Sequence, residues 1–363
     1  MAIETLCKAV VDAGHEMIVL TLTERDAFHA QMESLGIPAY STLMNRKPSW
    51  KYFLNQARFL IKFCKEHKID YVWSHLQEAN MIALLAQRFL KAKVVTFRHH
   101  AESAFYAEYG QQFRMQRNKN EIRFDKVINK LARVIVVPSS GVLEGMKTYE
   151  NCNMSKVVLA PYIYDFSKYG KPDIGAVKKI RDENACHLLL IMVSRFVPSK
   201  QHQPVFEVLD ELVREGLDLK MIVMDDGPLR KGFEAFTKEH KLQGRVSFVG
   251  YRSDFINYMA AADLLMHPSL TEASNNVVKE MGLLCKPAAV CKDVGDFNDY
   301  IRDRENSFLM KRDNLKEEIR KVLIDACKHK GVLPEYGARL REDVLHIFGD
   351  SAANRQRFLN LVK

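Results

Sequence analysis

Two glutamates eight residues apart, Glu272 and Glu280, are the side chains in this sequence best placed to do chemistry. The apolar run 262–266 before them predicts a short buried strand. The run after Ser274 places its apolar residues on one face of a helix. One carboxylate would therefore lie in the loop between strand and helix, and the other within the helix. The amides of the first helical turn have no partner inside the helix, so they favour an anion such as a phosphate.

The residues around this pair follow an ordered pattern. A strand ending in Pro268-Ser269 leads to Glu272, seven residues separate the two glutamates, and Cys285-Lys286-Pro287 follows. This order is similar to the donor-site signature of the family 4 retaining glycosyltransferases, although Cys285 stands where the family usually has glycine. Two acids at this spacing are common by chance, whereas the ordered context is much rarer. The plainer interpretation is a solvated acid followed by an acid on a helix surface.

The resemblance implies a fold and a set of roles. Family members have the GT-B fold, an α/β architecture of two Rossmann-like, doubly wound parallel-sheet domains facing a cleft. By this resemblance Glu272 faces the sugar and Glu280 binds the ribose hydroxyls of a nucleotide-sugar. The backbone amides of Ser274, Asn275 and Asn276 would meet its diphosphate. Carboxylates suit the first two roles because they accept hydrogen bonds from vicinal hydroxyls in pairs.

Two cations follow another predicted strand, 188–193. Arg195 and Lys200 lie just beyond its carboxyl end, where open α/β sheets bind ligands. The run resembles the family's Gly-Arg-x-x-x-x-Lys element, with Ser194 in place of the glycine. The resemblance implies that both cations hold the diphosphate, whose developing negative charge needs such stabilisation. A basic loop with solvated side chains is the simpler alternative.

Two further loops resemble family elements that hold the nucleotide. The run Asp225-Asp226-Gly227-Pro228 is similar to a Gly-x-Gly-Pro element, but Asp225 replaces the first glycine and brings an acid towards the nucleotide. The segment 246–252 resembles the one whose backbone reads the base, so Tyr251 and Arg252 are also candidates. An exposed loop explains these last two residues equally well.

Two histidines follow the strand predicted at 94–97. The run Arg98-His99-His100 is similar to one in related transferases, in which a histidine touches the donor sugar, and His99 is the first choice and His100 the second. A neutral imidazole can donate to a sugar hydroxyl, and a charged one can offset phosphate. His75 is a weaker candidate that could simply satisfy a strand end. The polar segment 101–120 is either an acceptor-side loop or an exposed connection.

Composition limits the partners. The chain has 363 residues, enough for two domains, and a net charge of +9 that favours nucleic acid, an anionic membrane surface or a diphosphate-bearing substrate. No nucleic-acid motif accompanies the charge, so no nucleic-acid partner is expected. The segment Trp50–Lys68 interleaves aromatic and basic residues and could lie on a membrane, although a core-packed helix with a basic edge is the plainer account. No apolar run is long enough to span a bilayer, and the N-terminus does not resemble a signal peptide.

Seven scattered cysteines without a Cys-x-x-Cys pair suit free thiols in a reducing cytoplasm. No cluster of metal-ligating residues is evident, so the expected chemistry uses no metal and no cofactor besides the nucleotide-diphosphate sugar.

Apolar strand-like runs alternate with helical patterns, which predicts parallel sheets. The expected domains are an N-terminal acceptor-side domain over 1–165, a nucleotide-sugar domain over 166–345, and a final helix over 346–363 that packs back on the first. The chain opens at Ala2–Leu6 with a pattern typical of the first helix, so the family's first strand and its glycine-rich loop are expected to be missing. The predicted strands are 17–22, 38–41, 71–74, 94–97, 134–137, 156–160, 188–193, 220–224, 246–249, 262–266, 288–291 and 307–310.

The leading hypothesis is a cytoplasmic, retaining hexosyltransferase that moves a sugar from a nucleotide-diphosphate sugar to a saccharide or lipid-linked saccharide in cell-surface polysaccharide synthesis. The resemblance implies attack from the front face, with the leaving phosphate taking the proton. Two alternatives remain open: a sugar-nucleotide epimerase of the same fold, and a degenerate or truncated homologue that only binds nucleotide-sugar. Changing Glu272 to glutamine should stop turnover, while a change at Lys279 should not.

Overall fold

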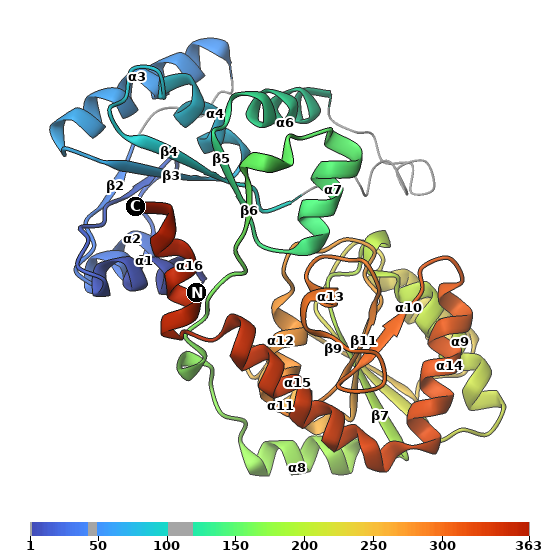
Figure 1. Cartoon of the computed structure of the whole chain (residues 1–363). Coiled ribbons are helices and arrows are strands. Elements are labelled where there is room, and N and C mark those ends of the chain that lie inside the picture. Colours follow the sequence, from blue (N-terminus) through green and yellow to red (C-terminus); the bar gives the residue numbers. More distant parts are fainter. Residues whose placement is uncertain (1, 43–48, 101–118, 363) are drawn as a thin grey trace. The chain divides into compact units, whose positions relative to one another are not determined.

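The computed structural model describes residues 2–42, 49–100 and 119–362, and it divides into two compact units (Figure 1). Unit 1 comprises Met1–Phe166 and Phe348–Lys363, and unit 2 comprises Ser167–Ile347. In both units the strands pair in parallel and helices connect them, which confirms the predicted α/β fold class.

Unit 2 contains one six-stranded sheet in the order β12-β11-β10-β7-β8-β9, and every pairing is parallel. The central strand β7 is a continuous apolar run and is buried on both faces, as expected for a parallel sheet covered by helices. The strands are β7 (Leu188–Val193), β8 (Leu219–Met224), β9 (Val246–Gly250), β10 (Leu264–His267), β11 (Ala288–Cys291) and β12 (Phe308–Met310).

Helices cover both faces of this sheet. α9 packs against α14, and α8 packs against α11, with the strands between the two pairs (Figure 1). A short 3-10 helix, η3 (Pro198–Lys200), follows β7. The helices are α8 (Ile174–Glu183), α9 (His202–Arg214), α10 (Arg230–Glu239), α11 (Phe255–Ala261), α12 (Asn276–Leu283), α13 (Phe297–Tyr300), α14 (Leu315–Lys328) and α15 (Leu333–Phe348).

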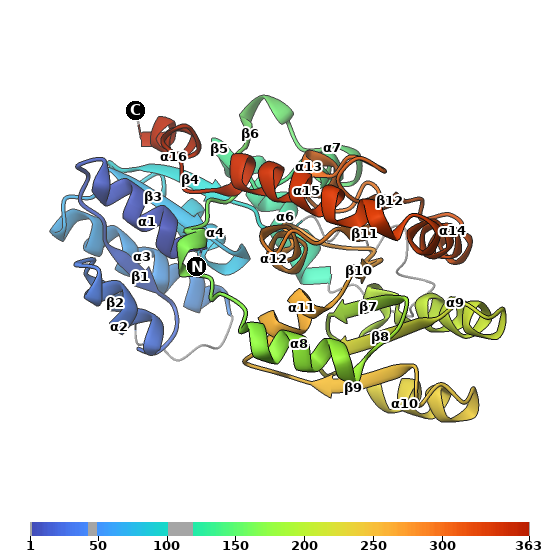
Figure 2. The same ribbon diagram turned by 90° about the horizontal axis from the view of Figure 1, so that it is seen from below.

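Unit 1 contains a four-stranded parallel sheet, β3-β4-β5-β6, and a separate two-stranded one, β1-β2. The C-terminal helix α16 (Ala352–Leu359) lies beside the first helix α1 in both views (Figures 1 and 2). The strands are β1 (Val19–Thr21), β2 (Ala39–Ser41), β3 (Tyr71–His75), β4 (Lys93–Phe97), β5 (Val134–Val137) and β6 (Val157–Leu159). The other helices are α1 (Ala2–Asp12), α2 (Ala27–Ser34), α3 (Trp50–Glu66), α4 (Gln77–Ala86), α6 (Lys119–Leu131) and α7 (Ser140–Glu150).

The strands of unit 1 are divided between two sheets. Within the described residues, β1 pairs with β2 and β3 pairs with β4, and no ladder joins β1 to β3. Helix α1 holds the two sheets together, because Leu6 and Ala9 pack in the core of the larger sheet and Cys7 packs in the core of the smaller one. Within the described residues, apolar burial of α1 therefore connects the two sheets.

All twelve predicted strands are present: three have the predicted bounds, and nine have at least one boundary shifted by one or two residues. Among the strands of unit 2, the largest boundary shift is at the strand predicted over 262–266, because Ala262 caps α11 and β10 begins only at Leu264. Within the described ranges, no helix is long and apolar enough to cross a membrane.

Candidate active site

The candidate residues of unit 2 follow the carboxyl ends of neighbouring parallel strands. Arg195 and Lys200 follow β7, Gly227 follows β8, Tyr251 follows β9, and Glu272 follows β10. Parallel strands end at one edge of the sheet, so their loops gather there. β7 and β10 are direct neighbours, and the amide of Leu270 bonds the carbonyl of Ser199 at 2.9 Å, which joins the two loops that carry Lys200 and Glu272.

Glu272 lies at the centre of this edge. Its carboxylate accepts a short hydrogen bond from Lys200 Nζ and another from His267 Nε2 at 2.7 Å, and its side chain is 12% exposed. Burial alone would raise the pKa of Glu272, but the bond from His267 and the charges of His267 and Lys200 outweigh burial and lower that pKa. Glu272 is therefore an ionised, fixed carboxylate. The sequence assigned Lys200 to a phosphate and Glu272 to a sugar, whereas the structure pairs the two directly.

A glycine that sequence reasoning missed supports Glu272 from the next loop. Gly295, after β11, has φ +55, and a Cβ there would lie 2.9 Å from Glu272 Cβ and 3.1 Å from its carbonyl carbon and oxygen. Only glycine allows both this backbone conformation and this approach. The signal in the sequence is a Gly-Asp pair just beyond a predicted strand.

The start of α12 is built around a buried ion pair. Lys279 Nζ lies 2.6 Å from Asp296 Oδ2, and the two side chains are 1% and 0% exposed. Lys279 also donates to Ser274 Oγ at 3.0 Å and to the carbonyl of Asn275 at 2.8 Å. Lys279 therefore belongs to the core. The expectation that a change at Lys279 does not stop turnover stays a prediction.

Part of the expected amide cradle is already occupied. The amide of Asn275 donates to Asp296 Oδ1 at 3.3 Å, and the Asn275 side chain caps α12 by accepting from the amide of Val278. The Ser274 hydroxyl also donates to Asp296, at 2.6 Å. A carboxylate of the protein therefore holds the Asn275 amide, and the expectation that this amide meets a diphosphate stays a prediction. Asn276, the first residue of α12, is exposed.

Two charged candidates remain open to a ligand. Arg195 is exposed, and within the described residues its guanidinium has no hydrogen-bond or ion-pair partner. Glu280 is half-buried in α12, and burial raises its pKa to about 7 despite the opposing charge of Lys279. Nearby, burial and the charge of Glu280 raise the pKa of Tyr169 to about 12. Arg195 can thus bind an anion, while Glu280 changes charge near neutral pH.

Gly227 has a packing role. A Cβ at this position would lie 2.7 Å from the backbone nitrogen of Phe196, so the loop after β8 presses directly on the loop after β7. The amide of Phe196 donates to the carbonyl of Asp226 at 3.1 Å. Asp225, where the family has glycine, has φ +92, a region that non-glycine residues rarely adopt.

Tyr251 and Arg252 lie at the sheet edge after β9, on the surface. Tyr251 is 84% exposed, and Arg252 is held by Asp254 through bonds of 2.8 and 3.0 Å. Neither side chain contacts the Lys200–Glu272 cluster among the described residues.

The histidines lie in unit 1, at the carboxyl edge of its four-stranded sheet. Arg98 is buried and fixes their loop through Asn129 at 2.9 Å and Glu150 at 3.0 Å. Both ring nitrogens of His99 have protein partners, Nε2 with His75 and Nδ1 with the Tyr162 hydroxyl. His75 thus does more than satisfy a strand end. His100 is exposed, and the polar segment 101–118 lies outside the described residues.

Comparison with known proteins identifies the family. Residues 2–167 match the family model Glycosyltransferase Family 4, and residues 175–339 match Glycosyl transferases group 1. The two matches cover nearly the whole chain and meet at the boundary between the units. The chain belongs to the family 4 glycosyltransferases of the GT-B fold.

Individual relatives of this family 4 chain act on lipid-linked or lipopolysaccharide substrates, to judge from their names. This chain is 26% identical to the N-acetylgalactosamine-N,N'-diacetylbacillosaminyl-diphospho-undecaprenol 4-alpha-N-acetylgalactosaminyltransferase of Campylobacter jejuni. The match covers 70% of this chain and 66% of that relative. It is 23% identical to the lipopolysaccharide glucosyltransferase WaaG of Escherichia coli, over 88% of this chain and 83% of WaaG. The chain thus spans about two thirds of the Campylobacter relative.

Solved structures share the fold. HepE of Anabaena, solved in complex with UDP, superposes with a TM-score of 0.80 at 18% identity, covering 99% of this chain and 94% of that one. WaaG superposes with a TM-score of 0.67 at 19% identity, covering 100% of this chain and 95% of that one.

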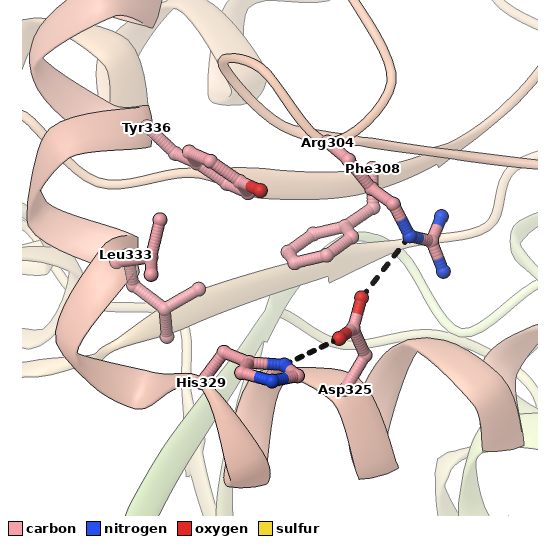
Figure 3. A pocket seen from close by; sticks show the side chains of 8 residues that line it. Arg304, Phe308, Asp325, His329, Leu333 and Tyr336 are labelled. Carbon is pink, nitrogen blue, oxygen red and sulfur yellow. Dashed lines mark hydrogen bonds and ion pairs between the residues drawn. The ribbon is translucent and has the colours of Figure 1, made fainter.

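The family 4 chain also has a cavity away from its candidate residues. A cavity of about 290 Å³ lies against α14, η4 (Lys330–Val332) and α15, where the rings of Phe308 and Tyr336 meet edge to face at 5.7 Å (Figure 3). At its side Asp325 bridges Arg304 and His329 at 3.1 and 2.7 Å. None of the sequence-predicted site residues lines this cavity. Within the described residues, no group of three or more His, Cys, Asp or Glu side chains could hold a metal ion.

Proposed function

We propose that this chain transfers a hexose from a nucleotide-diphosphate sugar to a saccharide or lipid-linked saccharide, with retention of configuration and without a bound metal. The observation that carries the proposal is the cluster at the carboxyl edge of the unit 2 sheet, where a fixed carboxylate, Glu272, meets Lys200. Arg195, which has no side-chain partner within the described residues, follows the same strand as Lys200. A departing diphosphate needs preorganised cations, and the hydroxyls of a sugar need a fixed acceptor. The cluster offers both.

The relatives point to the same substrates. HepE has been solved with UDP, with UDP and glucose, and with UDP-glucose, which supports a nucleotide-diphosphate sugar as donor. The Campylobacter and Escherichia coli relatives carry names that support a lipid-linked or lipopolysaccharide acceptor in cell-surface polysaccharide synthesis. No specific observation favours the epimerase or the non-catalytic alternative.

In the proposed reaction Lys200 must serve two partners. Its ammonium group has three donors, and Glu272 and Ser269, at 3.3 Å, engage two of them. A diphosphate can therefore take the remaining donor while Glu272 stays in place. Arg195 adds a planar fork that suits two phosphate oxygens. The leaving phosphate then takes the proton of the attacking hydroxyl, so no separate base is required.

The test is substitution of Glu272 by glutamine, which removes the charge and keeps the shape. Turnover of a panel of nucleotide-sugars should fall at least a hundredfold, about 3 kcal/mol of transition-state stabilisation. Thermal unfolding should stay within a few degrees of the wild type. The matched control is Glu239→Gln, because Glu239 is exposed at the end of α10. Wild-type turnover in the Glu272 variant, or an equal loss in the control, would contradict the proposal.

We further propose that the protein works at the cytoplasmic face of an anionic membrane. Most aromatic residues of α3 are buried, which favours the core-packed account of this helix, but Trp50 is 60% exposed and Leu54 37% exposed. Lys51 and Arg58 are exposed on the same helix. Exposed apolar and basic side chains on one helix suit an anionic interface. Co-sedimentation with vesicles should therefore rise with anionic lipid content, and indifference to that content would contradict the proposal.

A further inference from the structure

The cavity beside Phe308 and Tyr336 lies at the edge of the unit 2 sheet opposite Glu272. Phe308 begins β12, so it lies at the amino edge of this parallel sheet, whereas Glu272 follows the carboxyl end of β10. The volume of about 290 Å³ is at the small end of ligand pockets, so it suits a single sugar-sized ring better than a whole nucleotide-sugar. The proposed transfer of a sugar at the Glu272 edge therefore gives this cavity no role.

One part of the cavity wall is apolar. Phe308 and Leu333 are 2% and 3% exposed, and Ala326 is also buried. The half-buried ring of Tyr336 meets Phe308 edge to face (Figure 3). The face of an aromatic ring carries the negative part of its quadrupole, so it attracts positively polarised C–H groups. A ligand that fits this wall therefore presents C–H groups to it.

The other part of the wall is polar, and its members hold one another in place. Asp325 uses one oxygen for Arg304 Nε at 3.1 Å and the other for His329 Nδ1 at 2.7 Å. Arg304 Nη1 also lies 3.1 Å from Asp303, and the guanidinium carbon lies 5.9 Å from the centroid of the Phe308 ring. Two carboxylates thus offset one guanidinium, and the group has no net positive charge whether His329 is neutral or protonated. An anionic ligand therefore gains no attraction here.

Three polar groups of this wall are left for a ligand. Within the described parts of the chain, the Tyr336 hydroxyl, Nε2 of His329 and Nη2 of Arg304 have no hydrogen-bond partner. Nη2 is a donor, Nε2 of a neutral His329 that donates from Nδ1 is an acceptor, and a phenol is both. Uncharged hydroxyls, which donate and accept, can satisfy all three groups. A ring with C–H groups on its face and hydroxyls along its edge is a pyranose.

We propose that this cavity is a second carbohydrate site, which binds one uncharged hexose residue of a saccharide. Phe308 and Tyr336 contact the C–H face of the ring, while Arg304 and His329 bond its hydroxyls. Binding here requires neither a nucleotide nor the chemistry of transfer, so the inference goes beyond the proposed function. It gives the protein a contact for a glycan at the edge of unit 2 away from Glu272.

The test is titration of the whole protein with the methyl α-glycosides of glucose, galactose and mannose, followed by NMR of isotope-labelled methyl groups of Leu333. At least one glycoside should move these signals saturably, with a Kd on the order of 1–10 mM, as expected for so small a ligand. The methyl glycoside of glucuronic acid, which adds a carboxylate, should bind at least threefold more weakly than the glucoside. The proposal fails if none of the three gives a saturable shift up to about 50 mM, or if the glucuronide binds most tightly.

Variants assign the response to the cavity. Tyr336→Leu removes the ring and the hydroxyl and should weaken binding at least tenfold. Tyr336→Phe removes only the hydroxyl and should weaken it about three- to tenfold. The control is Tyr258→Leu, because Tyr258 is a half-buried tyrosine of α11 outside the cavity, and its Kd should match the wild type. With folding checked by circular dichroism, wild-type affinity in both Tyr336 variants, or an equal loss in the control, would overturn the proposal.

A last comparison separates this cavity from the proposed transfer site. Glu272→Gln should abolish transfer and leave the response of Leu333 unchanged, because the two residues lie at opposite edges of the sheet. If the Leu333 response is lost in Glu272→Gln, the glycoside binds at the Glu272 edge and the second site is refuted. If the wild type transfers no sugar but the Leu333 response depends on Tyr336, the second site holds and the proposed function fails.

Discussion

The buried ion pair beneath α12 allows a quantitative test of the site's foundation. The ammonium group of Lys279 has three donors, and all three are used, by Asp296, Ser274 and the Asn275 carbonyl. Burial lowers the pKa of Lys279, and the charge of Asp296 opposes that effect. Changing Lys279 to methionine removes the cation and leaves the carboxylate of Asp296 inside the protein without a counter-ion.

The expected loss is about 3–5 kcal/mol, the usual cost of breaking a buried pair from one side. For a unit of the size of Ser167–Ile347 this corresponds to a fall in Tm of roughly 6–20 °C. Asp296→Asn should be similarly harmful. The double variant, Lys279→Met with Asp296→Asn, should recover at least half of the loss, because no uncompensated charge remains.

The assay can distinguish the two units. The chain has two tryptophans, Trp50 and Trp73, and both lie in unit 1. Far-UV circular dichroism follows both units, whereas tryptophan fluorescence follows unit 1. The circular dichroism transition should fall in the single variants. This reasoning would be refuted if a single variant lost less than about 1 kcal/mol of unfolding free energy, or if the loss in the double variant equalled the sum of the two single losses. It would also be refuted if only the tryptophan fluorescence transition changed.

Three further predictions concern residues at or near the carboxyl edge of the unit 2 sheet. Gly295→Ala should displace Glu272 and lower kcat/KM by about a hundredfold, while the free energy of unfolding falls by only about 1–2 kcal/mol. Unchanged kinetics would contradict the close approach of Gly295 to Glu272. Because Glu280 has a folded pKa of about 7 against an ordinary 4.5, the folded state holds its proton more tightly, so stability falls as pH rises between these values. Glu280→Gln should therefore raise the free energy of unfolding at pH 8 by on the order of 3 kcal/mol, but should not raise it at pH 4. Equal gains at the two pH values would refute the assignment. Asp225→Gly should remove the backbone strain at φ +92, raise the free energy of unfolding by about 1 kcal/mol and tighten nucleoside diphosphate binding. A lower Tm or weaker binding would contradict this prediction.

The elements could be predicted because their signals are local. A buried parallel strand such as β7 appears as a continuous apolar run, and α12 shows the 3.6-residue period. The boundaries were less certain, since Ala262 is apolar but ends a helix. Motif spacing likewise located Glu272 and Lys200, because each follows the carboxyl end of a strand.

The partners of these residues depended on strand order, which no local pattern contains. β7 and β10 are neighbours in the sheet although they are far apart in sequence, and this adjacency is what joins Lys200 to Glu272. A lysine in a helix is usually exposed, so only packing could place Lys279 in the core. The chemical types and their order were thus determined by the sequence. The side chains that meet, and the hydrogen bonds that remain for a substrate, were decided by the tertiary structure, because long-range contacts follow from the arrangement of the strands.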